Sequence, residues 1–288
     1  MNPLLSFQPK FAEGYLRYSL HAVPVFAIVL ASLILISCGG STTTANKTAP
    51  PVPSPTPAPV PSPTPAPAPG ATVLPNVEDT HNWLTCGNCG NTGATGPAAT
   101  SSFTPGIASP SEDGTSTQFS IAATAAYSNA YFYLEHTPVS GQINALTYEF
   151  DIYIPQGKET APQAIEFECQ QTLGGWVYNF GWQALYQQDI WRIFDYGLKR
   201  WDATSVSFTP FTPGMWHHIL AEYHNDITAH IVYHDALTVD GVRYPVNVTH
   251  NAFYSGGSDK FTNAIQLDSN SAATPYSVYV DKMAITYR

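Results

Sequence analysis

The sequence predicts an all-β protein, and three observations indicate this fold class. Successive segments after residue 140 alternate in polarity or are rich in aromatic and β-branched residues, as strands are. Pro, Gly, Asn and Asp occupy the intervals between these segments and are typical of turns. No segment keeps the apolar period of an amphipathic helix over three turns. Many short strands joined by turns form a two-sheet sandwich or a barrel.

The expected strands share this alternation along the second half of the chain. They cover residues 145–154, 163–171, 175–185, 190–196, 216–224, 229–239, 263–268 and 277–286. The dipeptide Asp240-Gly241 separates two apolar runs and predicts a two-residue hairpin turn of type I′, because both residues tolerate positive φ.

Composition excludes several classes of protein and of partner. The chain has 288 residues, of which 44% are hydrophobic, 13% aromatic and only 11% charged, unlike a disordered or coiled-coil protein. The formal net charge of −10 disfavours a nucleic-acid partner. The same charge disfavours anionic polysaccharides but leaves neutral ones unaffected.

The first segment is an export signal. An apolar run over residues 24–36 is too short to span a bilayer and is followed at once by Ser37-Cys38-Gly39. This pattern resembles a bacterial lipobox, which implies that residues 1–37 are removed and that Cys38 is lipidated. Gly39, rather than Asp, then implies the outer membrane or cell surface. An ordinary signal peptide or an uncleaved anchor remains the alternative.

A stalk and one domain follow. Residues 38–70 are rich in Thr and Pro, and the octapeptide VPSPTPAP occurs at both 52–59 and 60–67. Proline at alternate positions favours extended polyproline II, so this linker is expected to hold the domain away from the membrane. Residues 71–288 are long enough for one large β-sandwich.

Three motifs resemble those of concanavalin A-like lectin and glucanase (LamG-like) domains. They are Trp216-His217-His218-Ile219, the hairpin Thr238–Val242 and the final strand Val278–Met283, and they occur in that order. The resemblance covers residues 148–288 and implies an antiparallel jelly roll whose concave face holds glycans. It further implies a structural calcium near Asp281; no other cofactor or metal is expected.

Three expected strands place polar side chains on one face. In 163–171 the alternation puts Ile165, Phe167 and Cys169 in the core and the intervening residues outside. The same rule puts Phe180, Trp182, Ile265 and Leu267 inside. The expected ligand-binding residues on the opposite face are Glu166, Glu168, Gln170, Asn179, Gln183, Gln266 and Asp268. Carboxylates and amides suit sugar hydroxyls, which both donate and accept hydrogen bonds.

Aromatic residues near these strands are candidate platforms for sugar rings. They are Trp176, Trp191, Tyr196 and Trp201. Packing in the core or in a loop is the alternative for each of them.

Glu166 and Glu168 are also weak candidates for catalysis. Residues i and i+2 of a strand lie about 6.5–7 Å apart, near the separation of paired carboxylates in glycosidases. Laminarinase-type glucanases carry E-I-D-x-E on their catalytic strand, and the matching residues here begin with Ala164. Alanine cannot act as a nucleophile, so the retaining mechanism is not expected. The triplet and basic groove typical of alginate lyases are not evident either.

Cysteine and histidine patterns add two smaller expectations. Cys86 and Cys89 form a CxxC motif, which in an exported chain predicts a local disulfide, whereas Cys169 is expected to be a buried free thiol. His230 and His234 lie about 13 Å apart if they share one strand, so they cannot share a zinc ion.

Three functions remain open. We expect a lipid-anchored, surface-displayed and non-catalytic glycan-binding protein. The first alternative is a glycoside hydrolase or polysaccharide lyase that acts on a neutral polysaccharide, and the second is a structural or adhesive surface protein.

Overall fold

The computed structural model describes residues 68–87, 99–136 and 141–288. The chain divides after residue 56, and everything described here belongs to the second part. Cys38, the export signal, most of the stalk and Cys89 lie outside the described residues, so the lipidation and the Cys86–Cys89 disulfide stay predictions. Within the described ranges, no helix has the length and apolar character needed to cross a membrane.

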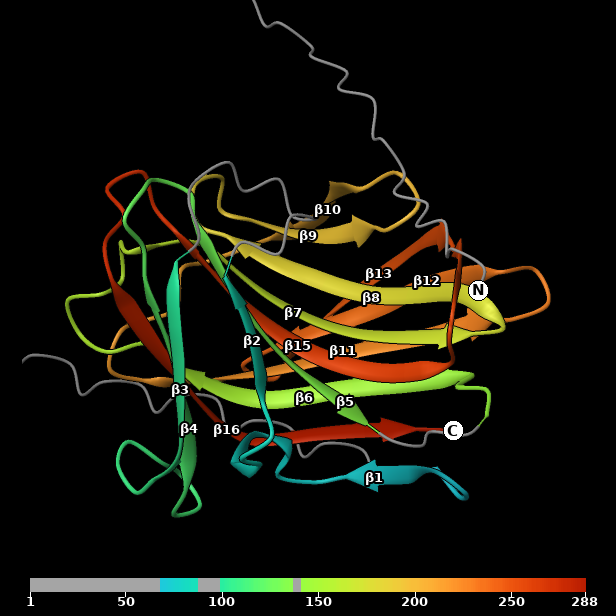
Figure 1. The fold of residues 1–288 in the computed structure, drawn as a ribbon, viewed down its shortest axis with the longest axis horizontal. Coiled ribbons are helices and arrows are strands. Elements are labelled where there is room, and N and C mark those ends of the chain that lie inside the picture. The colour runs from blue at the N-terminus through green and yellow to red at the C-terminus, as the bar shows by residue number, and fades with distance from the viewer. Residues whose placement is uncertain (1–67, 88–98, 137–140) are drawn as a thin grey trace, which may run out of the picture. The chain divides into compact units, whose positions relative to one another are not determined.

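Two antiparallel sheets of eight strands form a sandwich (Figure 1). Sheet A has the order β13-β12-β11-β6-β16-β4-β3, and β1 pairs with β16. Its strands are β1 (Thr72–Leu74), β3 (Thr100–Ile107), β4 (Ser116–Ala122), β6 (Ala145–Tyr153), β11 (Trp216–Asp226), β12 (Ile231–Val239), β13 (Val242–Asn251) and β16 (Tyr276–Tyr287).

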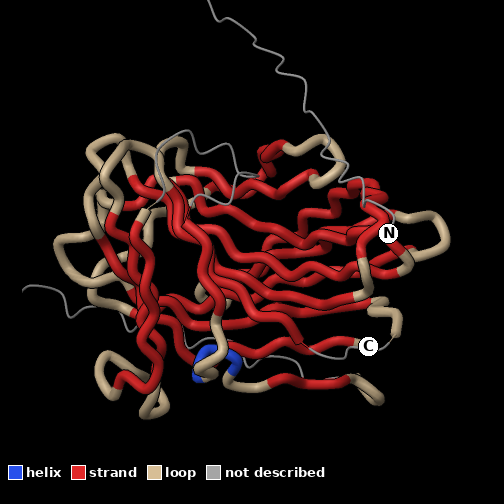
Figure 2. Tube along the Cα trace, viewed as in Figure 1, coloured by secondary structure: helices blue, strands red, loops and turns tan. Residues whose placement is uncertain are grey.

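Sheet B has the order β10-β9-β8-β7-β15-β5-β2, and β14 pairs with β8. Its strands are β2 (Leu84–Gly87), β5 (Asn129–His136), β7 (Pro162–Leu173), β8 (Gly175–Leu185), β9 (Ile190–Asp195), β10 (Arg200–Ser207), β14 (Phe253–Gly257) and β15 (Lys260–Ser269). The helical content of the described chain is one short 3₁₀ turn, η1 (Val77–Asp79), drawn in blue in Figure 2.

The predicted fold class is confirmed, and every strand expected from the alternation is present. The Asp240-Gly241 turn is confirmed as well: φ is 49° at Asp240 and 79° at Gly241, as a type I′ turn requires. The alternation did not anticipate β1, β2, β3, β4, β5, β10 and β14, and of β13 it indicated only the run that follows the Asp240-Gly241 turn.

The core lies between the sheets, where the predicted inner faces meet. Phe167 of sheet B packs edge-on against Phe150 of sheet A with ring centroids 5.1 Å apart. Phe180 packs against Tyr223 in a tilted arrangement, with ring centroids 5.0 Å apart. All seven side chains assigned to the inner face are buried: Ile165, Phe167, Cys169, Phe180, Trp182, Ile265 and Leu267. Cys169 is also a free thiol, as expected.

Candidate functional site

The outward face of sheet B brings the predicted polar residues together. Strand β7 lies between β8 and β15, so side chains from three distant stretches of sequence become neighbours. We call this set the polar face; it consists of Glu166, Glu168 and Gln170 on β7, Asn179 and Gln183 on β8, and Gln266 and Asp268 on β15.

Each acid of the polar face is paired with an amide. Gln183 lies directly opposite Glu166, and its Nε2 donates to Glu166 Oε1 at 2.7 Å. Asn179 Nδ2 donates to Glu168 Oε2 at 3.0 Å. Gln266 Nε2 donates to Asp268 Oδ1 at 2.9 Å. The expected hydrogen bonding between acids and amides is therefore present.

This pairing leaves a set of acceptors without partners. Because each amide uses its nitrogen to hold an acid, its oxygen is left over. The amide oxygens of Asn179, Gln183 and Gln266 are buried and meet no hydrogen-bond donor among the described residues. A buried acceptor without a donor costs about 1–3 kcal/mol, so three in one place call for water or a ligand.

Burial of the polar face is deeper than the alternation alone suggested. Glu166 and Gln266 are each only 1% exposed, and Asp268 is 8% exposed. Gln170 is half-buried. If this sheet face met only water, these side chains would be exposed. The acids and amides of the polar face instead lie below the molecular surface.

Glu166 and Asp268 form a carboxyl pair on the polar face. Burial raises the pKa of Glu166 well above its usual range, and the neighbouring Asp268 raises it further. Burial also raises the pKa of Asp268, to about 7, while a hydrogen bond from Glu166 opposes the rise. Burial and the proximity of the two acids thus both favour the neutral form of Glu166.

Glu168 has a different environment. Burial raises the pKa of its carboxyl group, and the hydrogen bond from Asn179 and the charge of Lys199 oppose this rise. The Lys199 ammonium itself lies 3.0 Å from the ring centroid of Tyr196, so a cation and an aromatic ring stand at this end of the polar face.

Aromatic side chains flank the polar face on both sides. Tyr131 and Tyr133 lie on β5 opposite Gln266 and Ala264 of β15. On the other side, Phe194 of β9 packs against Trp201 of β10, with ring centroids 5.0 Å apart, and against Tyr196.

Of these flanking residues, Tyr196 and Trp201 were expected from the sequence, whereas Tyr131, Tyr133 and Phe194 were not. The alternation in the run NAYFYLEH of β5 could have identified the two tyrosines, because Phe132 and Leu134 point into the core.

Gly181 lies between the polar face and the aromatic side chain of Phe194. It lies opposite Glu168, and a Cβ added there would come 3.0 Å from Asn179 Oδ1 and 3.1 Å from Phe194 Cβ. A side chain at this position would therefore push Phe194 or the Asn179 carboxamide away from its present place.

The expectation for Trp191 is wrong. This side chain is 1% exposed and packs among Phe167, Trp182 and Phe208 in the core. The alternation of β9 accounts for this, because Trp191 pairs with the inward-facing Ala184.

Trp176 is also not on the polar face. It has the same parity along β8 as Tyr178 and Phe180, and its ring is stacked on His230 with centroids 3.8 Å apart and an interplanar angle of 12°. The imidazole covers one face of the indole, where a sugar would have stacked.

The residues near the expected calcium site form a buried acidic pair. Asp281 is fully buried, and it accepts hydrogen bonds from Ser111 Oγ at 2.9 Å and from the Glu112 and Lys282 amides at 2.6 and 2.8 Å. Burial raises the pKa of the nearby Glu78 to about 8. Protein donors thus bind both oxygens of Asp281, and the calcium stays a prediction.

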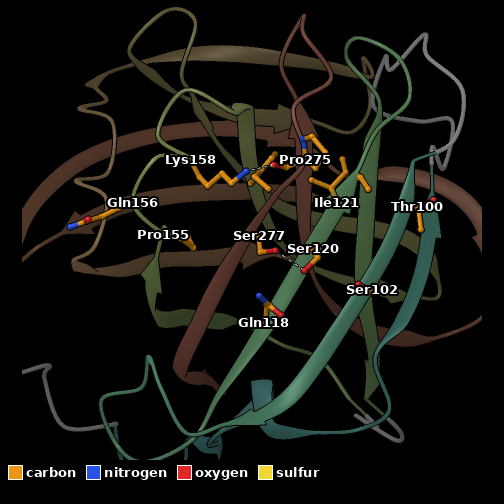
Figure 3. A pocket seen from close by; sticks show the side chains of 12 residues that line it. Thr100, Ser102, Gln118, Ser120, Ile121, Pro155, Gln156, Lys158, Pro275 and Ser277 are labelled. Carbon is orange, nitrogen blue, oxygen red and sulfur yellow. Dashed lines mark hydrogen bonds between the residues drawn. The ribbon is translucent and has the colours of Figure 1, made fainter.

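A cavity of about 390 Å³ lies on the other sheet (Figure 3). Its wall is rich in hydroxyl and amide groups, including Ser102, Gln118, Ser120 and Ser277, and the last two share a hydrogen bond of 2.8 Å. Lys158 at its rim donates to the Pro275 carbonyl. The cavity contains no carboxyl group and no unpartnered buried acceptor, so we regard the polar face as the better candidate site.

No family model and no curated protein sequence matches the chain. Among solved structures, the study "Structural basis for the promiscuous specificity of the carbohydrate-binding modules from the beta-sandwich super family" supplies a match at 14% identity with a TM-score of 0.38. It covers 72% of this chain, which in turn spans only 58% of that one.

Two further solved structures match this chain with comparably low sequence identities and TM-scores. "Cellulose induced protein, Cip1" matches at 8% identity over 70% of this chain and 90% of its own, with a TM-score of 0.44. The endo-1,3-beta-glucanase from Streptomyces sioyaensis matches at 12% identity over 78% and 99%, with a TM-score of 0.40. At these values the comparisons do not by themselves assign a function.

Proposed function

We propose that this protein is a glycan-binding protein displayed at the bacterial cell surface on a lipid anchor, and that the polar face of sheet B holds the sugar. The ligand is a neutral polysaccharide or oligosaccharide. The proposal covers binding without turnover.

The unpartnered amide oxygens carry this proposal. Those of Asn179, Gln183 and Gln266 are acceptors held in fixed positions by the acids that bind their nitrogens. Sugar hydroxyls supply the missing donors and can also accept hydrogen bonds in return. Because these oxygens are buried, the amide side chains must rotate as the sugar binds, and each hydrogen bond gained offsets the cost of leaving an acceptor unpaired.

The aromatic flanks and the net charge narrow the ligand class. Tyr131 and Tyr133 on one side and Trp201 on the other lie beside the polar face, whereas Lys199 covers the ring of Tyr196. The chain carries a net charge of −10, and three carboxyl groups belong to the polar face itself. An anionic polysaccharide would be repelled, which favours neutral glycans.

The test is a binding screen of the full chain against neutral polysaccharides, with alginate and pectin as anionic controls. We expect saturable binding to at least one neutral glycan and none to the anionic ones. Isothermal titration calorimetry with the best ligand then gives its affinity. Absence of binding across a broad panel would contradict the proposal and leave the structural or adhesive role.

A second candidate function is cleavage of the glycan, and the Glu166–Asp268 pair favours it. A carboxyl group whose pKa is raised can act as a general acid near neutral pH, and a neighbouring carboxylate can act as a base. Release of reducing ends or of unsaturated products from the bound glycan would establish this function in place of simple binding.

The anchor and stalk belong to the same proposal. Lipidation at Cys38 would hold the protein on the membrane, and the repeated VPSPTPAP linker would carry the domain away from it. A site for external polysaccharides is useful only at the outer surface, so we propose the outer membrane or cell surface as its location.

A further inference from the structure

Two aspartates and a histidine converge at an edge of the sandwich, away from the polar face. Asp195 ends β9, Asp202 lies on β10, and His250 lies on β13 of the other sheet. One possible ligand atom from each residue lies within 4.8 Å of those from the other two. Of these atoms, His250 Nδ1 and Asp195 Oδ2 are 3.1 Å apart.

The positions of these residues are unusual for polar side chains. Asp202 pairs with Ile193, which is 1% exposed, and His250 pairs with Val232, which is 2% exposed. Paired residues share a face, so both polar side chains point into the space between the sheets. The apolar core ends here, and charged groups from both sheets occupy its rim.

The cluster is shielded and partly oriented by its surroundings. The side chain of His250 is only 8% exposed and that of Asp195 is 12% exposed. The Leu198 amide donates to Asp195 Oδ1 at 2.9 Å, which fixes that carboxylate in the way that metal ligands are commonly fixed. Gly197 leaves space beside it: an added Cβ would lie 3.3 Å from Asp195 Oδ1 and 3.8 Å from the Asn251 carbonyl oxygen.

The donor set indicates which ion would fit. Two carboxylates and one imidazole suit zinc and related transition ions, whereas calcium prefers six to eight oxygens and rarely takes nitrogen. Ligands bound at about 2.0–2.1 Å to a tetrahedral ion lie about 3.3 Å apart, close to the separation of His250 Nδ1 and Asp195 Oδ2. Two carboxylate charges balance a divalent ion.

Arg200 is the competitor for this role. Its Nε lies 2.7 Å from Asp202 Oδ1, and its Nη2 donates to Asp202 Oδ2 at 3.2 Å, so Arg200 neutralises one of the two carboxylates through both oxygens. The Arg200 side chain is 59% exposed, and it can turn into solvent without disturbing the core. An ion with two further ligands in place would displace it.

We propose that Asp195, Asp202 and His250 bind one divalent transition ion of the zinc class, which joins the edge of sheet B to the edge of sheet A. The ion would hold β13 against β9 and β10 where apolar packing ends. This site is independent of the proposed glycan site.

The test uses the untagged full chain, treated with a chelator and then titrated with ZnCl₂. Calorimetry measures zinc binding, and thermal unfolding measures stabilisation. We expect zinc, but not CaCl₂, to raise the melting temperature. His250→Gln and Asp195→Asn should each weaken zinc binding by at least about 100-fold, since even residues behind the ligands change affinity by about 10–100-fold.

Two further variants make the result specific. His224→Gln is the matched control, because His224 Nδ1 lies 2.8 Å from Asp235 Oδ2 in a more exposed pair with no second carboxylate. This variant should bind zinc like the wild type. Arg200→Gln removes the competing cation and should raise zinc affinity several-fold.

Either of two results would contradict the zinc proposal. If His250→Gln and His224→Gln bind zinc alike, or if zinc leaves the melting temperature of the wild type unchanged, the cluster only covers the sheet edges and the proposal is wrong. Asp202 is the most exposed of the three ligands. The variant Asp202→Asn therefore tests zinc binding if the other two variants fail to fold.

Discussion

Gln183 Nε2 donates a 2.7 Å hydrogen bond to Glu166 Oε1 from the position directly opposite on the neighbouring strand. Asp268 is a second neighbour of Glu166, and its charge adds to burial in raising the pKa of Glu166. Glu166 thus lies between an amide that stabilises its charged form and an acid that stabilises its neutral form.

The Glu166–Asp268 pair predicts that stability falls as pH rises. Both pKa values are raised in the folded protein, so between pH 4 and a little above 7 the folded state holds more protons than the unfolded state. Each extra proton lowers the free energy of unfolding by about 1.4 kcal/mol per pH unit in that window. Glu166→Gln should flatten the decline, as measured by urea unfolding from pH 5 to 8.

The matched control for this experiment is Glu159→Gln, because this side chain is exposed and the exchange leaves the carboxyl pair intact, so the decline should persist. An equal slope for Glu166→Gln and the wild type would show that the carboxyl pair holds no extra proton.

Glu168→Gln is predicted to weaken glycan binding by about 1–3 kcal/mol, the range for a lost charge-assisted hydrogen bond. The loss has a direct part and an indirect one, since Glu168 also positions the Asn179 amide. Calorimetry with the best neutral glycan measures it. Glu222→Gln, on the opposite sheet, should bind as the wild type does.

If the protein cleaves its glycan, the substitutions should affect turnover and binding differently. Glu168→Gln or Glu166→Gln would then retain most of the binding and lose turnover. Unchanged affinity together with no turnover in the wild type would remove these acids from any role in the site.

Gly181→Ala is predicted to disturb the polar face without unfolding the protein. The new methyl group would lie 3.0 Å from Asn179 Oδ1 and 3.1 Å from Phe194 Cβ, so the Asn179 carboxamide must shift away from Glu168. We expect stability to fall by about 1–3 kcal/mol, as overpacking usually costs, and glycan affinity to fall with it.

Gly114→Ala provides a comparison for this variant, because nothing lies within 4 Å of a Cβ added at Gly114, although its φ of 117° adds backbone strain. It should lower stability and leave affinity unchanged. A normal affinity for Gly181→Ala would argue against a role for the Asn179–Glu168 pair in binding.

Cys38→Ala is predicted to release the protein from membranes. Without the thiol there is no acceptor for the lipid, and export should continue because the apolar run over 24–36 is intact. Metabolic labelling with a tritiated fatty acid and membrane fractionation provide the measurements. Unchanged membrane association would overturn the lipoprotein prediction, and Ser37→Ala serves as the neighbouring control.

The sequence by itself determined the fold class and the two faces of each strand. Period-two alternation is a local property, so the assignment of Phe167 and Trp182 to the core and of Glu166 and Gln183 to the opposite face needed no tertiary information. The Asp240-Gly241 hairpin was determined for the same reason, because only a few dipeptides tolerate two successive positive φ angles.

Only the tertiary structure decided which strands are neighbours. Strand β15 inserts between β7 and β5, which brings Gln266 and Asp268 beside Glu166 across about a hundred residues of sequence, and nothing in the local pattern encodes that pairing. The same long-range packing covers Trp176 with His230. It also brings His250 to the two aspartates from the opposite sheet, because two sheet edges meet where the shared core ends.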